Sequence, residues 1–187
     1  MTPNELLQTV KTRFSILLHD DEAALNAELK KAIGTYQDLA GFMAKLRIND
    51  SPELRRSNEI ELPERFASRL VLKDAAGRFV SCEVWGNKLE LGLNGHEQFP
   101  LKLLYLENLL DVDFNSYQLP VNSISLIADY LYLLICKPNS ERLRKMFISG
   151  KLDVSDIPLE ADINTRITEL EQRIKDSRAI MPSISLM

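Results

Sequence analysis

Apolar residues recur every three or four positions along the first forty residues, which is the repeat of an amphipathic helix. In the first run, Thr2 and Glu5 fit a capping box with proline in the first turn. The second run lies in the segment 17–41, where Asp20 or Asp21 can cap a helix. Its apolar face consists of Ala24, Leu25, Leu29, Ala32, Ile33 and Tyr36. The pattern predicts two capped helices, and residues 42–48 could extend the second one.

Between Phe66 and Leu93 the repeat changes to two, which is typical of strands with one apolar face. Turn sequences at 74–77 and 86–87 separate three such runs. We therefore expect a three-stranded antiparallel sheet, inserted at about residues 59–95. The polar segment that overlaps its start, residues 49–65, is expected to form a loop or arm.

Residues 99–120 fit both the helical repeat of three to four residues and the strand repeat of two. Spacing of the apolar positions from Leu101 to Leu109 can make a short helix, whereas the alternation of Leu101, Leu103 and Tyr105 can equally make a strand. We favour the helix.

The segment Pro120–Cys136 has the broadest apolar stripe in the chain and predicts a central core helix. Pro138 is expected to end it, because proline lacks the N–H that continues a helix. Asn139 can then cap a short separate helix that ends near Gly150.

The last predicted helix carries a narrow apolar seam on an otherwise charged surface. The seam consists of Leu159, Ile163, Ile167, Leu170 and Ile174, and its candidate binding residues are the last four. A seam of this width packs on one other helix. That helix belongs either to the same chain, which is the default, or to a neighbouring subunit.

The final segment, residues 178–187, is apolar and almost uncharged, unlike an ordinary frayed terminus. It can add to a sheet edge or insert into a groove of another chain, or fold back on its own core. Its candidate binding residues are Arg178, Ile180, Met181, Ile184 and Leu186.

Together these patterns predict a mainly α protein. We expect a helical bundle with an inserted antiparallel sheet as a single domain over residues 1–177, followed by an extended C-terminal tail at 178–187.

Charge and composition narrow the function classes. With a net charge of −4 and a pI of about 5.3, we do not expect the protein to bind DNA phosphates through a broad positive surface. Cys82 and Cys136 lie in apolar runs, where cysteine behaves as a small buried hydrophobe in a reducing compartment. The sequence has no signal-peptide pattern and no run that could cross a bilayer. We expect a soluble protein made in the cytoplasm, without a membrane partner.

Candidate chemistry is sparse. The only histidines, His19 and His96, stand in polar turns, and the cysteines lack zinc-site spacing. Asp111 and Asp113 lack the glycine and glutamate of a calcium loop. No nucleophile elbow, phosphate loop or metalloprotease helix is present. The sequence therefore predicts no catalytic residue, no metal and no cofactor, although distant residues of an enzyme could still converge.

Two segments resemble the head-to-tail connector (adaptor) proteins of tailed bacteriophages. In residues 15–41, an apolar end and the acidic turn HDDE precede Leu25, Leu29, Ala32 and Tyr36. The second match is "LP" at 119–120 before a helix that contains ADYLYLL at 128–134. The resemblance implies a structural virion protein of the neck, made in the host cytoplasm.

In that family the subunits form a ring, typically of twelve copies, which docks on the portal, contacts the next neck or tail protein and lets DNA pass. The resemblance places the portal contact in the C-terminal segment. The alternative from the residues alone is a cytosolic binding or regulatory module that pairs through its last helix.

Overall fold

The computed structural model describes residues 1–151 and 153–178 and divides the chain into two compact units. The helical unit takes residues 1–41 and the chain from Leu109 onward, and the β unit is Phe42–Asn108. The prediction of a mainly α fold is wrong. With 45% helix, 20% strand and two three-stranded antiparallel sheets, the described chain is α+β.

In its described residues the helical unit consists of the helices α1 (Pro3–Lys11), α2 (Glu22–Leu39), α4 (Val121–Ser149) and α5 (Glu160–Asp176). The capping box at the start of α1 is present, since Thr2 and Glu5 exchange hydrogen bonds. The Asp21 carboxylate caps α2 by accepting from Ala24 N–H at 2.8 Å. The predicted buried face of α2 is confirmed at Leu25, Leu29, Ala32, Ile33 and Tyr36.

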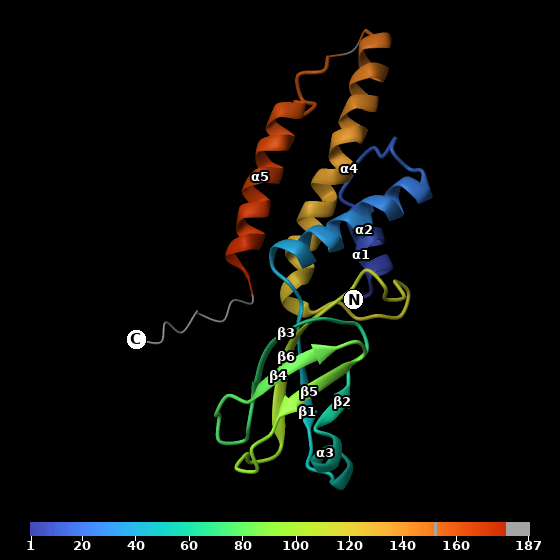
Figure 1. The fold of residues 1–187 in the computed structure, drawn as a ribbon. Coiled ribbons are helices and arrows are strands. Elements are labelled where there is room, and N and C mark those ends of the chain that lie inside the picture. The colour runs from blue at the N-terminus through green and yellow to red at the C-terminus, as the bar shows by residue number, and fades with distance from the viewer. Residues whose placement is uncertain (152, 179–187) are drawn as a thin grey trace. The chain divides into compact units, whose positions relative to one another are not determined.

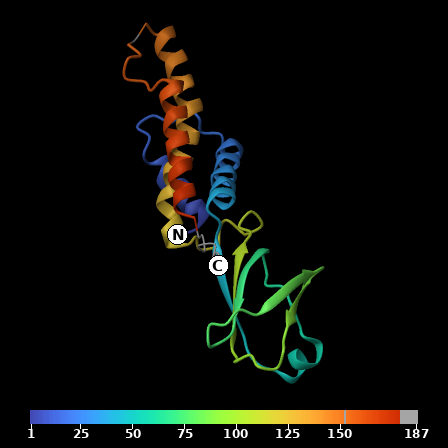
Figure 2. The same ribbon diagram turned by 60° about the vertical axis from the view of Figure 1, so that its left-hand side comes forward.

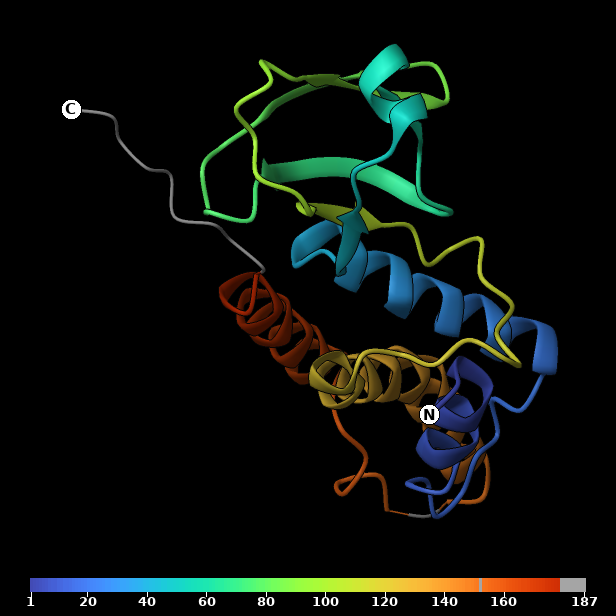
Figure 3. The same ribbon diagram turned by 90° about the horizontal axis from the view of Figure 1, so that it is seen from below.

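The long helix α4 is the centre of this unit. It runs antiparallel to α5 (Figures 1 and 2), and α1 and α5 flank it when the molecule is seen from below (Figure 3). Contrary to expectation, α4 continues through Pro138 for 29 residues. Buried side chains on both sides of the proline hold the helix in place, among them Ile135, Cys136, Asn139 and Ser140. Packing on these residues outweighs the one hydrogen bond that proline removes.

The β unit contains α3 (Pro52–Ser57) and six strands. The strands are β1 (Met43–Ile48), β2 (Glu59–Glu61), β3 (Phe66–Lys73), β4 (Ser81–Trp85), β5 (Lys88–Gly92) and β6 (Leu101–Glu107). They form two antiparallel sheets, ordered β1-β6-β3 and β2-β5-β4. Side chains from both sheets share one core, including Leu72, Leu101 and Leu103 from the first and Cys82, Leu89 and Leu91 from the second.

Two strands of this unit were expected to be helical. The sequence allows residues 42–48 to extend α2 and favours a short helix from Leu101 to Leu109, yet β1 and β6 lie there and pair with each other. Gly41, at φ 76°, ends α2 in a backbone conformation that favours glycine. The β unit therefore extends on both sides of the predicted insertion at 59–95.

The three predicted strands separate into the two sheets. β4 and β5 form a hairpin, but β3 pairs with β6. Between β3 and β4 only Lys73 and Phe79 form an isolated bridge in the described chain. The backbone N–H of Glu107 also donates to Phe42 O at 2.8 Å, so the chain enters and leaves the β unit at neighbouring positions.

Candidate functional site

The predicted seam of α5 is used within the chain. Ile163, Leu170 and Ile174 are buried, with Ile174 fully enclosed, and Ile167 is half-buried. Their helix packs on α4 and α2. The structure thus brings these four residues together on the side of α5 that faces its own unit. The prediction that Leu159 belongs to the seam is wrong, because it is the N-cap residue that precedes α5 and is 56% exposed.

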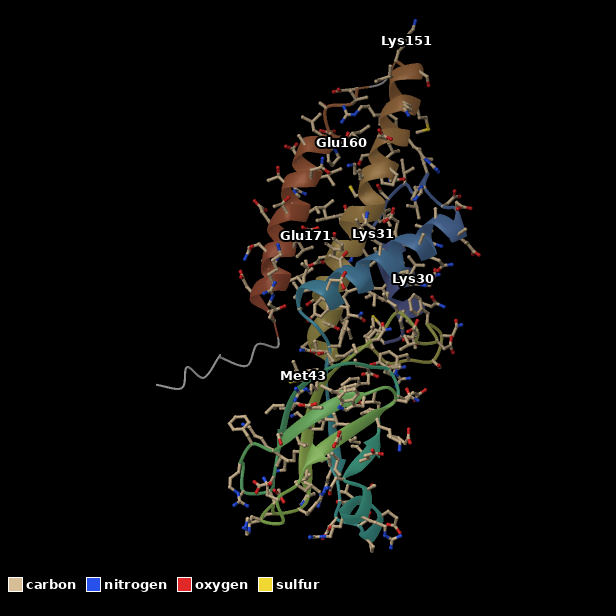
Figure 4. All side chains as sticks on the ribbon, in the orientation of Figure 1. Lys30, Lys31, Met43, Lys151, Glu160 and Glu171 are labelled. Atoms are coloured by element: carbon tan, nitrogen blue, oxygen red, sulfur yellow. The ribbon has the colours of Figure 1, made fainter. Side chains whose placement is uncertain are left out.

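Polar contacts reinforce the pairing of α5 with α4. Tyr130 donates to the Glu171 carboxylate at 2.8 Å, and Lys137 pairs with Glu160 at 2.8 Å. Figure 4 shows Glu160 and Glu171 along α5, with Lys151 just beyond the end of α4. Burial, together with the Glu171 carboxylate, raises the pKa of Tyr130 to about 12, so its hydroxyl remains a donor at neutral pH.

Of the predicted tail residues, Arg178 alone is described. Its guanidinium Nε donates to the carbonyl of Leu39 at 2.7 Å, which links the segment after α5 to the end of α2. Ile180, Met181, Ile184 and Leu186 lie outside the described residues.

A groove of about 270 Å³ beside α4 was missed by sequence reasoning. Phe14 and Tyr132 stack at its edge with ring centroids 4.7 Å apart. Its other apolar lining residues are Ile16, Leu143, Phe147, Ile157 and Pro158. The Cys136 sulfur lies 3.6 Å from Ser140 Oγ in its wall. The groove brings together segments that are more than a hundred residues apart, so no local pattern could have revealed it.

Both units expose large apolar side chains. In the helical unit they include Val121 at 87% and Ile148 at 60% exposed, with Met146 and Leu159. In the β unit they include Trp85 at 66% and Phe79 at 60%, with Val84 and Met43. Such side chains on ordered elements are typical of surfaces that bind other proteins.

The two outer sheet faces of the β unit carry opposite charges. On the first sheet, Lys102 lies directly between Arg47 and Lys73 in the strand register, and we call these three the basic row. On the second sheet, Glu90 lies directly between Glu59 and Glu83, and we call these three the acidic row. Residues that lie opposite each other in a ladder share one face of the sheet, so each row crosses all three strands.

An ion pair between Asp74 and Arg78 stabilises the turn that follows β3, beside the basic row. The Asp74 carboxylate is 1% exposed and accepts from Arg78 N–H and Gln98 N–H at 2.9 and 3.2 Å. Burial opposes its ionisation, but the Arg78 guanidinium and these N–H groups outweigh burial and lower the pKa of Asp74 to about 2. Asp74 is therefore committed to Arg78 and does not neutralise the row.

Within residues 1–151 and 153–178, no group of three or more His, Cys, Asp or Glu side chains is arranged to hold a metal ion. In the same residues, no helix has both the length and the apolar character needed to cross a bilayer. Both findings concern the described residues alone.

Comparison with models of known protein families finds no match, and comparison with curated proteins finds none either.

Proposed function

We propose that this chain is a structural assembly subunit, a phage head-to-tail connector that forms a homomeric ring between portal and tail. The observation that carries the proposal is that each of its two units exposes large apolar side chains. They include Met146 and Ile148 in the helical unit, and Phe79 and Trp85 on different faces of the β unit. A ring subunit has neighbours on both sides as well as axial partners, so it requires several separate contact surfaces. The resemblance of residues 15–41 and 119–134 to connectors supports the same function.

In this role the helical unit maintains the subunit's shape, and the C-terminal segment 178–187 grips the portal. DNA is passing cargo, which accords with a chain whose net charge is −4. The mature protein resides in the neck of the virion, and it performs no catalysis.

The alternative, a regulatory module that pairs through α5, requires the α5 seam to leave α4. Burial of Ile163, Leu170 and Ile174 opposes this, because exposing them costs apolar contact with the rest of the unit. The connector proposal needs no such rearrangement.

The test is to purify the full chain and the portal protein of the same virus, mix them, and image the particles by electron microscopy. We expect rings of the chain stacked coaxially on the portal. A chain that forms no ring, alone or with the portal, contradicts the proposal.

A second arm tests the tail. The 1–177 chain should lose portal binding while its circular dichroism spectrum remains that of the full chain. Retained binding would remove the tail assignment and leave the ring proposal standing.

A further inference from the structure

The basic row places three positive charges on neighbouring strands at the distance of direct cross-strand pairs. Arg47 and Lys102 are exposed, and the Lys73 ammonium lies 4.7 Å from the centre of the Phe79 ring. Lys45 stands two residues before Arg47 and extends the positive face. In the described chain, none of these four side chains forms an ion pair. Like charges placed directly opposite each other destabilise a sheet, so an anionic partner would stabilise this face.

The acidic row has the same geometry with the opposite sign. Glu83 and Glu90 are exposed, while Glu59 pairs with Lys88 at 2.6 Å. Lys88 neutralises one of the three carboxylates and leaves the face net negative. A cationic partner would stabilise this second face for the same reason.

The two rows point away from each other on opposite sides of one core. Leu72 and Leu103, on the inner face of the first sheet, share that core with Leu89 and Leu91 of the second. Alternation along each strand therefore directs the rows outward in opposite senses. The β unit as a whole has as many basic as acidic residues, so the rows separate charge within a neutral body.

We infer that the basic row of one copy binds the acidic row of the next copy, so that the β units associate head to tail. A contact between two different faces of the same protein is heterologous, and it builds a ring where the rotation closes and a filament where it does not. The inference rests on the proposed function only for closure into a ring. The contact itself rests on the two charged rows.

Exposed aromatic side chains support this contact, and each charged face has a hollow of its own. A groove of about 640 Å³ is lined by Lys45, Arg47, Lys73 and Lys102, and a hollow of about 280 Å³ includes Glu83 and Glu90. Each row also has an exposed aromatic residue beside it. Phe79 lies against Lys73, and Trp85 is on the same strand face as Glu83, two residues further on. Aromatic anchors next to complementary charges are typical of protein interfaces.

DNA phosphates are the other anions that a basic face can bind. DNA binding would leave the acidic row without a partner, whereas binding of a second copy uses both rows. A neutral β unit in an acidic chain also lacks the wide positive field that DNA binding uses. We therefore assign the basic row to a second copy.

The test uses charge reversal in the full chain. One variant carries Arg47→Glu and Lys102→Glu, which makes the basic row net negative, because Lys73 is then the one positive residue of its three. The other carries Glu83→Lys and Glu90→Lys, so both faces are basic. The control carries Lys30→Glu and Lys31→Glu, which changes charge on the exposed surface of α2 (Figure 4).

Sedimentation velocity at low and high salt measures self-association of each protein. We expect the unmodified chain and the control to associate at low salt, and each reversed variant to associate at least tenfold more weakly. An equimolar mixture of the two reversed variants should recover association, because acidic and basic faces then alternate. High salt should weaken all of these contacts.

Several outcomes would overturn the inference. They are an unmodified chain that remains monomeric at low salt, reversed variants that associate like the unmodified chain, and a mixture that fails to recover. Rings that persist in the reversed variants would overturn the inference and leave the connector proposal intact. Charge-dependent open filaments would support the inference and contradict the ring.

Fluorescence anisotropy with a 30-base-pair duplex provides the last arm. If Arg47→Glu with Lys102→Glu abolishes DNA binding and leaves self-association unchanged, the basic row belongs to phosphates and the inference fails. We expect no difference in DNA binding between this variant and the control.

Discussion

One amide side chain joins the loop after α1 to the middle of the long helix. Asn139 is 3% exposed; its carbonyl accepts from Leu18 N–H and His19 N–H at 2.7 and 3.2 Å. Its amino group donates to Ile16 O at 3.0 Å. All three partners are backbone groups that would otherwise need water as a partner. The Asn139 side chain therefore provides the hydrogen bonds that secondary structure would provide elsewhere.

Asn139→Ala is therefore expected to destabilise the chain by about 2 kcal/mol, because it leaves buried backbone groups without partners. Urea unfolding followed by circular dichroism measures the change. Glu141→Ala, on the exposed side of the same helix, is the control and should stay within about 0.5 kcal/mol of the unmodified chain. Equal stability of the two variants would contradict this role of Asn139.

The Asp74 carboxylate makes the stability of the fold depend on pH in the acidic range. Its pKa falls from 3.8 to about 2 on folding, so the unfolded chain takes up a proton at higher pH than the folded one. The stabilisation is complete above about pH 4 and is lost as the pH falls from 4 towards 2.

Asp74→Asn should lower the thermal midpoint by several degrees at pH 7, because Arg78 loses its anionic partner. It should also reduce the further fall in midpoint between pH 4 and 2. Differential scanning calorimetry across this range measures both effects, with exposed Asp38→Asn as the control. A variant whose midpoint follows the unmodified chain at every pH would show that the ion pair contributes nothing.

At the scale of elements, the α5 seam offers a graded comparison. Ile174 is fully enclosed, whereas Ile167 on the same seam is half-buried. We expect Ile174→Ala to cost about 3 kcal/mol and Ile167→Ala about 1 kcal/mol, since the cost follows the apolar contact that is lost.

Chemical unfolding at low protein concentration measures both variants. If both variants lower the free energy of unfolding of the monomer by the same small amount, α5 does not pack on α4 as it does in the structure. Ile167→Ala is the control for Ile174→Ala, because both substitutions remove the same side-chain atoms.

The elements differ in how far the sequence alone could predict them. The N-terminal caps and the buried face of α2 follow from local spacing, and the structure confirms them. β1 and β6 could not be assigned because the spacing of their apolar residues also fits a helix, and only the pairing of the two strands decides between the alternatives. The passage of α4 through Pro138 likewise depends on packing from other segments.

The charged rows illustrate the same limit at the candidate site. Arg47 and Lys73 are 26 positions apart, and only the register around Lys102 makes them neighbours. The acidic row depends in the same way on the placement of Glu90 between β2 and β4. Alternation in the predicted strands places Lys73 and Glu90 opposite the apolar face, but Arg47, Lys102 and Glu59 lie in segments that were expected to be helix or loop.

At the scale of the molecule, the β unit is an insertion with its own core and paired ends. We expect Phe42–Asn108, expressed alone, to give the circular dichroism of a folded β protein with a cooperative thermal transition. It should be less stable than the full chain, because so short a chain buries a smaller share of its surface. Absence of a cooperative transition would show that the unit needs the rest of the chain to fold.

The hydrogen bond between Glu107 N–H and Phe42 O has a consequence for how such a protein can diverge. Because the two junctions are adjacent, one contiguous stretch of gene encodes the entire β unit, and any sequence with paired terminal strands can be exchanged for it. Recombination at the codons for residues 42 and 108 would then transfer a complete set of neighbour contacts in one event. Subunit recognition could change in this way while the helical unit keeps its own sequence.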